Sequence, residues 1–149
     1  MSVVSTIPAC LDALVARLQA RPGLAGVEVT SGPLGIDDTA TESIQFDSVE
    51  ADQDWASAIR RSRDETYTIR GFLWIVKPGA DEPAIKAARD RAFELFDELA
   101  LALHEDPTLG GVVRTAQVRR PRLDQGIWGD GSRAARIQFD IEVSARLTP

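Results

Sequence analysis

The side chains best suited to acid–base catalysis are few, because this sequence has a single histidine, His104. His104 falls near the carboxyl end of a predicted helix, where the helix dipole favours a cation. Its neighbours Glu105 and Asp106 do not form the spacing of a catalytic triad or of a metal site with it. We therefore expect His104 to have a capping or surface role.

Cys10 is the only cysteine, and it falls near the amino end of a predicted helix, which favours the thiolate form. No family signature surrounds it, and the histidine is far away in sequence. We interpret Cys10 as a small apolar residue of the first helix and expect no catalytic residues and no enzymatic activity. A single cysteine also excludes an intrachain disulfide and a cysteine-based zinc cluster.

An acidic run with no basic residue before Arg60 marks the first half of the chain. Its carboxylates are Asp37, Asp38, Glu42, Asp47, Glu50, Asp52 and Asp54. Their oxygens could hold a divalent cation, but the run lacks the glycine turn and the terminal bidentate glutamate of a calcium loop. We expect a solvated or partner-facing surface here, and neither a metal nor a cofactor.

A local basic patch follows in the second half of the chain. It consists of Arg114, Arg119, Arg120 and Arg122. Such a patch could contact nucleic acid, or it could meet the acidic run of a neighbouring subunit in a head-to-tail oligomer. We favour the oligomer contact, because the whole chain is acidic.

The glycine-rich segment Gly126–Gly131 does not match a phosphate-binding loop or a dinucleotide fingerprint. It is typical of a flexible hairpin tip. Trp128 within it would be exposed in a monomer, whereas large aromatic side chains are enriched at the centres of interfaces. We therefore predict that Trp128 contacts a partner.

Length and charge set broad limits on the function. The chain has 149 residues, with 23 acidic and 17 basic side chains and a formal net charge of -6. This balance argues against a protein whose main task is to grip a nucleic-acid backbone. The amino-terminal residues lack the pattern of a signal peptide, and no apolar stretch of about 18 residues is present to span a bilayer. We expect a cytoplasmic site of synthesis and no membrane contact.

The first half predicts one helix and three strands. The helix spans Thr6–Arg21, with Thr6 as its cap, and a strand follows at Val27–Thr30. A second strand is indicated around Ile44 and Phe46, and the polar segment beyond it, which contains Trp55, is interpreted as a connecting excursion. The third strand, Thr66–Lys77, is apolar on both faces and predicts a central strand covered on both sides.

The second half predicts a long helix and two strands. The helix opens near Asp81 and continues for about 24 residues. Val112–Val118 indicate a fourth strand, followed by an arginine- and glycine-rich excursion over Arg119–Arg133. In Ile137–Leu147 apolar and polar residues alternate strictly, which predicts a strand with one buried face.

Together these elements predict a single α+β domain spanning residues 1–149. Its sheet is mainly antiparallel and four- to five-stranded, with two helices packed on one face, in the order α-β-β-β-α-β-β.

The order and texture of these elements resemble the tail terminator, or tail completion, proteins of long-tailed bacteriophages (siphophages) over nearly the whole chain. The resemblance rests on the opening helix Ile7–Leu14, on Val27–Val29 followed by Gly32-Pro33, on the strand Gly71–Val76, on the long helix and on the alternating last strand.

The resemblance implies a subunit that assembles into a ring, expected to be a hexamer, on the last ring of the tail tube. Such a ring stops tube polymerisation and joins the tail to the head-to-tail connector or stopper protein. It implies a place in the tail or neck of the virion after assembly in the host cytoplasm. The family has no known catalytic residues. DNA would pass the lumen without specific binding, and an acidic surface suits such a channel.

We expect the acidic run, the segment Arg119–Arg133 and the polar face of the last strand to form inter-subunit, stacking or lumenal surfaces. The candidate interface residues are Asp37, Asp38, Asp47, Asp52, Asp54, Arg119, Arg120, Arg122 and Trp128. Two alternatives remain open at this point: another neck component, such as a head-closure or connector protein, and a cytoplasmic ligand-binding domain or small enzyme with a pocket between sheet and helices.

Overall fold

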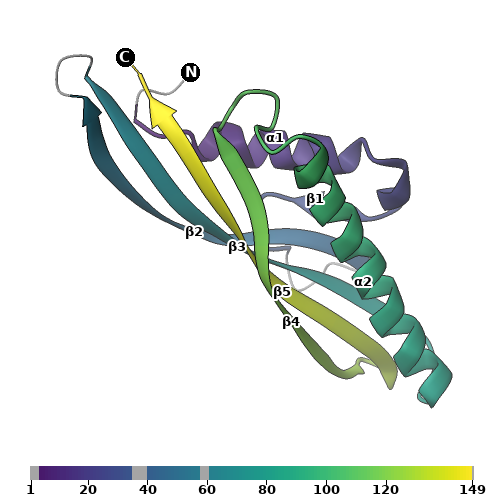
Figure 1. Ribbon diagram of the computed structural model, residues 1–149. Helices are drawn as coiled ribbons and strands as arrows, with labels where there is room; N and C mark the ends of the chain where they lie inside the picture. Colours follow the sequence, from purple (N-terminus) through teal and green to yellow (C-terminus); the bar gives the residue numbers. More distant parts are fainter. Residues whose placement is uncertain (1–3, 35–39, 58–60, 149) are drawn as a thin grey trace.

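A computed structural model describes residues 4–34, 40–57 and 61–148 (Figure 1). The elements in chain order are α1 (Ile7–Gln19), a short 3₁₀ turn η1 (Pro22–Leu24), β1 (Glu28–Thr30), β2 (Glu42–Ser57), β3 (Ser62–Lys77), α2 (Glu82–Glu105), β4 (Thr115–Trp128) and β5 (Ser132–Leu147). They confirm the predicted α+β class and the predicted order of elements.

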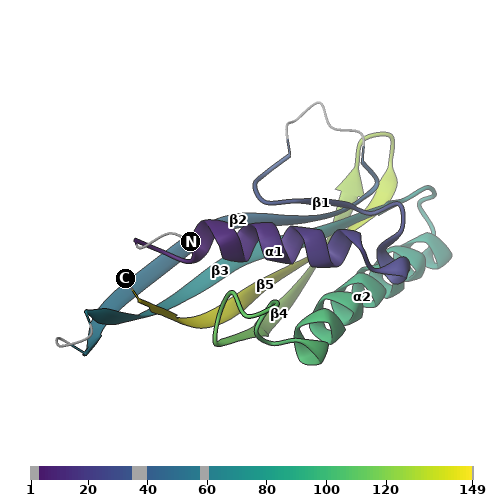
Figure 2. The same ribbon diagram turned by 90° about the horizontal axis from the view of Figure 1, so that it is seen from above.

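The five strands form one sheet in the order β1-β2-β3-β5-β4. The four long strands are antiparallel to their neighbours, whereas the short β1 pairs in parallel with the start of β2. The sheet is therefore mixed. Both helices lie on the same side of it, and their apolar residues join one core with the strand residues beneath them (Figure 2).

The helix α2 begins and ends as the sequence predicts. The side chain of Asp81 accepts a hydrogen bond from the backbone N–H of Ala84 at 3.2 Å, and Pro83 occupies the first turn, where no N–H donor is needed. Its buried stripe consists of Ala84, Ala88, Ala92, Leu95, Leu99, Ala102 and Leu103. The small alanines of this stripe allow the helix to lie close to the sheet.

The amino end of α1 differs from the prediction that Thr6 caps it. The Thr6 hydroxyl donates instead to the Glu65 carboxylate at 2.7 Å, and the Thr6 backbone N–H donates to the same oxygen at 2.8 Å. Because this hydroxyl has only one hydrogen, it accepts from the Tyr67 hydroxyl at 2.9 Å. A buried tertiary contact with β3 has taken the place of a local cap.

Glu65 is fully buried, and its second carboxylate oxygen accepts a hydrogen bond from the Gln53 amide at 2.7 Å. Burial opposes ionisation of Glu65, but the hydrogen bonds from Thr6, Ser5 and Gln53 outweigh it and hold the pKa of this carboxyl below its ordinary value. The ionised side chain thus ties α1 and β2 to β3.

The strand β3 is central, as predicted, but it is not covered on both sides. Its odd-numbered residues from Glu65 to Ile75 are buried under the helices, whereas its even-numbered residues from Thr66 to Val76 are exposed or half-buried. Two helices on one side leave the other face of the sheet open. The predicted alternation of Ile137–Leu147 is confirmed, since the odd positions of this stretch are buried and the even ones are not.

Both predicted excursions are strands, so these two expectations are wrong. Residues Asp47–Ser57 continue β2, and residues Arg119–Trp128 continue β4 up to a tight turn at residues 129–131. The apolar alternation disappears in these stretches because both lie at edges of the sheet and expose most of their side chains. Each strand contains a bulge, between Phe46 and Ser48 and between Arg119 and Arg122.

The described part of the chain contains no helix that is both long enough and apolar enough to cross a membrane.

Gly71 is required where two phenylalanines pack beneath the sheet. It pairs with Phe46 of β2 and Phe139 of β5, whose rings meet edge to face at 6.2 Å. A Cβ atom at Gly71 would lie 2.7 Å from the Gln45 carbonyl oxygen and 2.8 Å from the Phe139 ring. We expect Gly71→Ala to lower the free energy of unfolding by about 1–3 kcal/mol, measured by urea denaturation.

Gly126→Ala is the matched control for this variant, because Gly126 also lies in a strand and a Cβ there meets no atom within 4 Å. It should leave stability unchanged or raise it slightly. Equal losses in the two variants would contradict the packing explanation.

Glu65 provides a second test. Glu65→Ala leaves the buried Thr6 donors without their acceptor, so we expect a loss of about 1–3 kcal/mol in the free energy of unfolding. Glu50→Gln, at an exposed carboxylate of β2, should change it by less than about 0.5 kcal/mol.

The pH dependence of stability follows from the lowered pKa of Glu65. The stabilisation from its carboxylate is complete above the unfolded-state pKa of about 4.3 and is lost as the pH falls through the lower folded-state value. Urea titrations below about pH 4.3 should therefore show a steeper loss in the wild-type chain than in Glu65→Gln. Identical slopes would contradict the assignment.

Candidate functional site: the open face of the sheet

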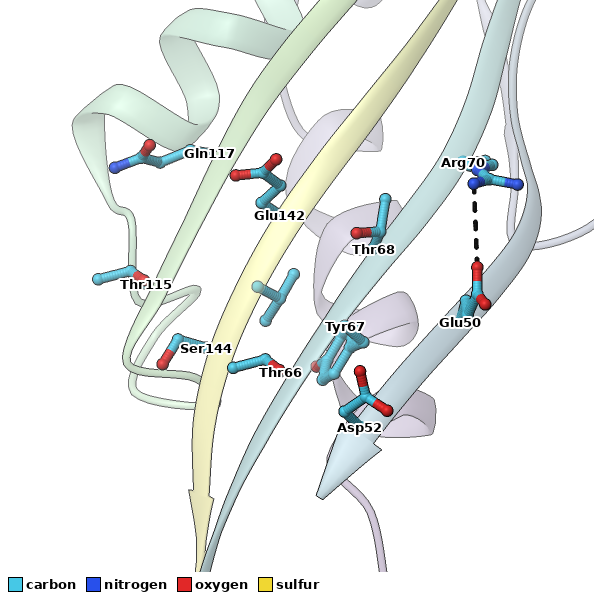
Figure 3. A pocket seen from close by; sticks show the side chains of 11 residues that line it. Glu50, Asp52, Thr66, Tyr67, Thr68, Arg70, Thr115, Gln117, Glu142 and Ser144 are labelled. Atoms are coloured by element: carbon cyan, nitrogen blue, oxygen red, sulfur yellow. Dashed lines mark ion pairs between the residues drawn. The ribbon is translucent and has the colours of Figure 1, made fainter. Parts of the chain in front are cut away.

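The candidate site is the face of the sheet that the helices leave uncovered. Strand pairing places Asp52 of β2, Thr66 of β3, Ser144 of β5 and Thr115 of β4 in one row across it. The next row contains Glu50, Thr68, Glu142 and Gln117. These side chains come from all four long strands and surround an open hollow of about 500 Å³ (Figure 3).

The hollow is lined by carboxylates, hydroxyls, one amide and the Arg70 guanidinium, which pairs with Glu50 at 3.9 Å (Figure 3). Within the described residues, no group of three or more His, Cys, Asp or Glu side chains could hold a metal ion. The chemistry of this surface is that of a hydrated polar wall: it can bind water and contact a polar partner.

The described residues of the acidic run lie at separate places in the structure and do not form one cluster. Asp52 and Asp54 are exposed on the open face, and Asp47 is exposed in the β2 bulge. Glu42 lies at the other end of the strand, where Arg91 of α2 binds both of its oxygens at 2.8 and 3.0 Å and lowers its pKa. Asp37 and Asp38 lie outside the described residues.

Three of the four arginines of the predicted basic patch lie on β4, and the fourth, Arg114, lies just before it. All four are paired with carboxylates of the same chain, Arg114 with Asp64 at 3.8 Å. Arg119 contacts Glu142 at 2.9 Å, and Arg120 contacts Asp140 at 3.1 Å and Glu142 at 3.0 Å. Arg122 contacts Asp124 at 3.3 Å. The three arginine side chains are still 54–72% exposed. They remain available to a partner, and their predicted role at an interface stays a prediction.

Trp128 is half-exposed and packs against another tryptophan that the sequence analysis did not select. Its ring meets Trp74 of β3 edge to face, with centroids 5.2 Å apart. In the strand register Trp74 is opposite Arg136 and Trp128 is opposite Ser132, so the contact crosses β5 diagonally. Phe72 and Trp74 are both at even positions of β3 and so lie on the same face of the sheet. This spacing is the sequence signal that could have predicted the aromatic end of the open face.

Arg136 of β5 lies at the same aromatic end. Its guanidinium is 4.3 Å above the Phe72 ring. The segment after β1 also reaches this end of the face, where the Leu34 backbone N–H donates to the Gln45 side chain at 2.9 Å. The open face therefore has an aromatic, partly covered end and a polar, exposed end.

The two side chains considered first for catalysis lie away from this face. Cys10 is fully buried in the core, as predicted, and burial raises the pKa of its thiol. His104 is exposed in the last turn of α2, where a surface role was predicted. The structure does not bring these two side chains together with the open-face carboxylates.

No family model and no curated protein matches this chain. Among solved structures, it is similar to a chain of the virion of a native gene transfer agent particle. The TM-score is 0.54 at 12% sequence identity, and the match covers 91% of this chain and 94% of that chain. At this identity the similarity shows a shared fold.

The contact between Trp74 and Trp128 can be tested directly. Trp128→Ala should lower the free energy of unfolding by about 1 kcal/mol, because it removes an aromatic pair at a half-exposed site. It should also reduce the near-ultraviolet circular dichroism of the folded chain. Trp55→Ala, at a tryptophan that is 70% exposed, is the control and should have the smaller effect on both. Equal effects would contradict the pairing.

Proposed function

We propose that this chain is a structural protein of a virion, of the tail terminator type. In this role it forms a ring, hexameric by the resemblance, that caps the tail tube, stops its polymerisation and joins the tail to the head-to-tail connector. The observation that carries the proposal is the fold shared with a virion chain over 91% of this chain. The order of elements, which resembles tail terminators, supports it independently.

The open face of the sheet suits the lumen of such a ring. On the rows that the strand register defines, acidic residues outnumber basic ones. The acidic residues are Glu50, Asp52, Asp54, Asp64, Asp124, Asp140 and Glu142, and the basic ones are Arg70, Arg119, Arg122, Arg136 and Arg146. Arg120, in the β4 bulge, also contacts Asp140 and Glu142 of this face. The face therefore has no excess of positive charge that would hold phosphates, so in the proposed ring DNA passes it without specific binding.

The arginines of this face are also partly neutralised. Arg146 binds Asp64 through two contacts, at 2.7 and 3.1 Å, and Arg119 and Arg70 have Glu142 and Glu50 as partners. Guanidinium groups that already contact carboxylates hold a sliding phosphate backbone less strongly than free ones. This arrangement favours passage of DNA over binding.

In the proposed particle, the partners are further copies of this chain, the tail tube protein on one side and the connector or stopper protein on the other. The protein is assembled in the host cytoplasm and then lies in the tail or neck of the virion. A head-closure or connector role at the same neck is the alternative, and the position of the ring in the particle distinguishes the two.

Light scattering coupled to size-exclusion chromatography, together with electron microscopy of purified tail tubes, tests the proposal. We expect a ring of six copies, and tubes that stop growing and carry this ring at one end when the chain is added. Tubes without the chain, which continue to grow, are the control. A chain that stays monomeric and leaves competent tubes uncapped would falsify the proposal, and a label found only on portal-side rings would favour the alternative.

A further inference from the structure

The sheet has two long edges that lack a partner strand among the described residues. At one edge, β1 pairs only with Ser43–Gln45, so β2 has β3 alone as its neighbour from Phe46 to Ser57. At the other edge, β4 has β5 alone as its neighbour. Backbone N–H and C=O groups along such edges bind water or another strand.

The directions of the strands match across these two edges. The four long strands alternate in direction in the order β2, β3, β5, β4, so β2 and β4 run in opposite directions. If a second copy stands beside the first in the same orientation, its β2 is antiparallel to the β4 of the first. An antiparallel pair can then form between copies, and the sheet continues from one copy into the next.

The two edges also lie at the same height along the strands. Asp52 of β2 and Thr115 of β4 lie in one row of the sheet, and Ser48 and Arg119 lie in another. Copies related by rotation alone, as in a closed ring, therefore present overlapping stretches of the two edges to each other. The bulge at Arg120 and Pro121 limits the regular part of the β4 edge to Thr115–Arg119.

The charges at the two edges are opposite. The β2 edge exposes Glu50, Asp52 and Asp54, whereas the β4 edge exposes Arg119 and Arg120. Charged side chains on edge strands often prevent the strands of different molecules from pairing. Like charges on both edges would have that effect. Opposite charges attract two copies and set the register between them.

We infer that the edge of β2 over Ser48–Asp54 of one copy pairs antiparallel with the edge of β4 over Thr115–Arg119 of the next copy. This inference rests on the proposed ring and identifies its joint. The sheets of successive copies form one continuous wall, with the open face on one side and the helices on the other.

Charge reversal tests the joint in the full-length chain. Glu50→Arg combined with Asp52→Arg makes the β2 edge net positive, like the β4 edge, and Arg119→Glu combined with Arg120→Glu makes the β4 edge negative, like the β2 edge. Each pair of changes should reduce the fraction of chain in rings by about tenfold or more. The variant with all four changes has opposite charges on the two edges again and should recover ring formation. Asp12→Arg, at an exposed residue of α1, changes the charge in the same direction as the β2 variant but away from both edges, and should leave assembly unchanged. Far-ultraviolet circular dichroism checks that each variant is folded.

Cysteine cross-linking provides the second measurement. Asp52→Cys is combined in turn with Thr115→Cys, Gln117→Cys and Arg119→Cys, while the native Cys10 is buried and stays unreactive. Oxidation of assembled rings should give a ladder of covalent oligomers for at least one pair and none for a single cysteine substitution.

The outcomes separate the joint from the proposed function. Rings that form normally in both charge reversals, and that give no ladder with any pair, would overturn the joint and leave the ring itself intact. A wild-type chain that remains monomeric would overturn both.

Discussion

Burial of only one face of the sheet is the constraint on which the rest of this structure depends. Two helices cover one side of four long strands, so the position of a residue along its strand decides whether it meets the core or the solvent. On the covered side, the absence of a side chain at Gly71 leaves room for the rings of Phe46 and Phe139. On the other side, the same strands carry carboxylates, hydroxyls and paired arginines. One alternating pattern thus produces both the stable core and the polar surface.

Elements with strong local signals were predictable from the sequence. The last strand alternates without exception over Ile137–Leu147, and α2 has a capping aspartate and a continuous apolar stripe. The second half of β2 and the part of β4 from Arg119 onward were not predictable in the same way. Their side chains are exposed at an edge of the sheet, so hydrophobic periodicity is missing, and the strands are defined by pairing with distant residues.

Some residues of the candidate surface were selected from the sequence, but its other residues and their arrangement were not. Charge and exposure alone identified Asp52, Asp54 and the arginines of β4. The pairing of Arg119 with Glu142, and of Glu42 with Arg91, depends on the strand register and on helix placement, which no local pattern contains. Thr6 shows the same limit, because a buried carboxylate 59 positions away competes with the local cap. Tertiary contacts override local preference where a polar group would otherwise be buried without a partner.

The order of the strands also has a consequence for how the chain folds. The hairpin of β2 and β3 and the hairpin of β4 and β5 are each local, but the pair that joins them, β3 with β5, sets Ile69 against Ile141 across the whole of α2 and β4. Non-local pairing of this kind is slow compared with hairpin formation, so the joining of two preformed hairpins is the expected late step. Until that step, the inner edges of β3 and β5 are unpaired. At high chain concentration during synthesis, a hairpin from another copy can compete for these edges. Exchange of hairpins between chains would therefore begin at the β3–β5 pair.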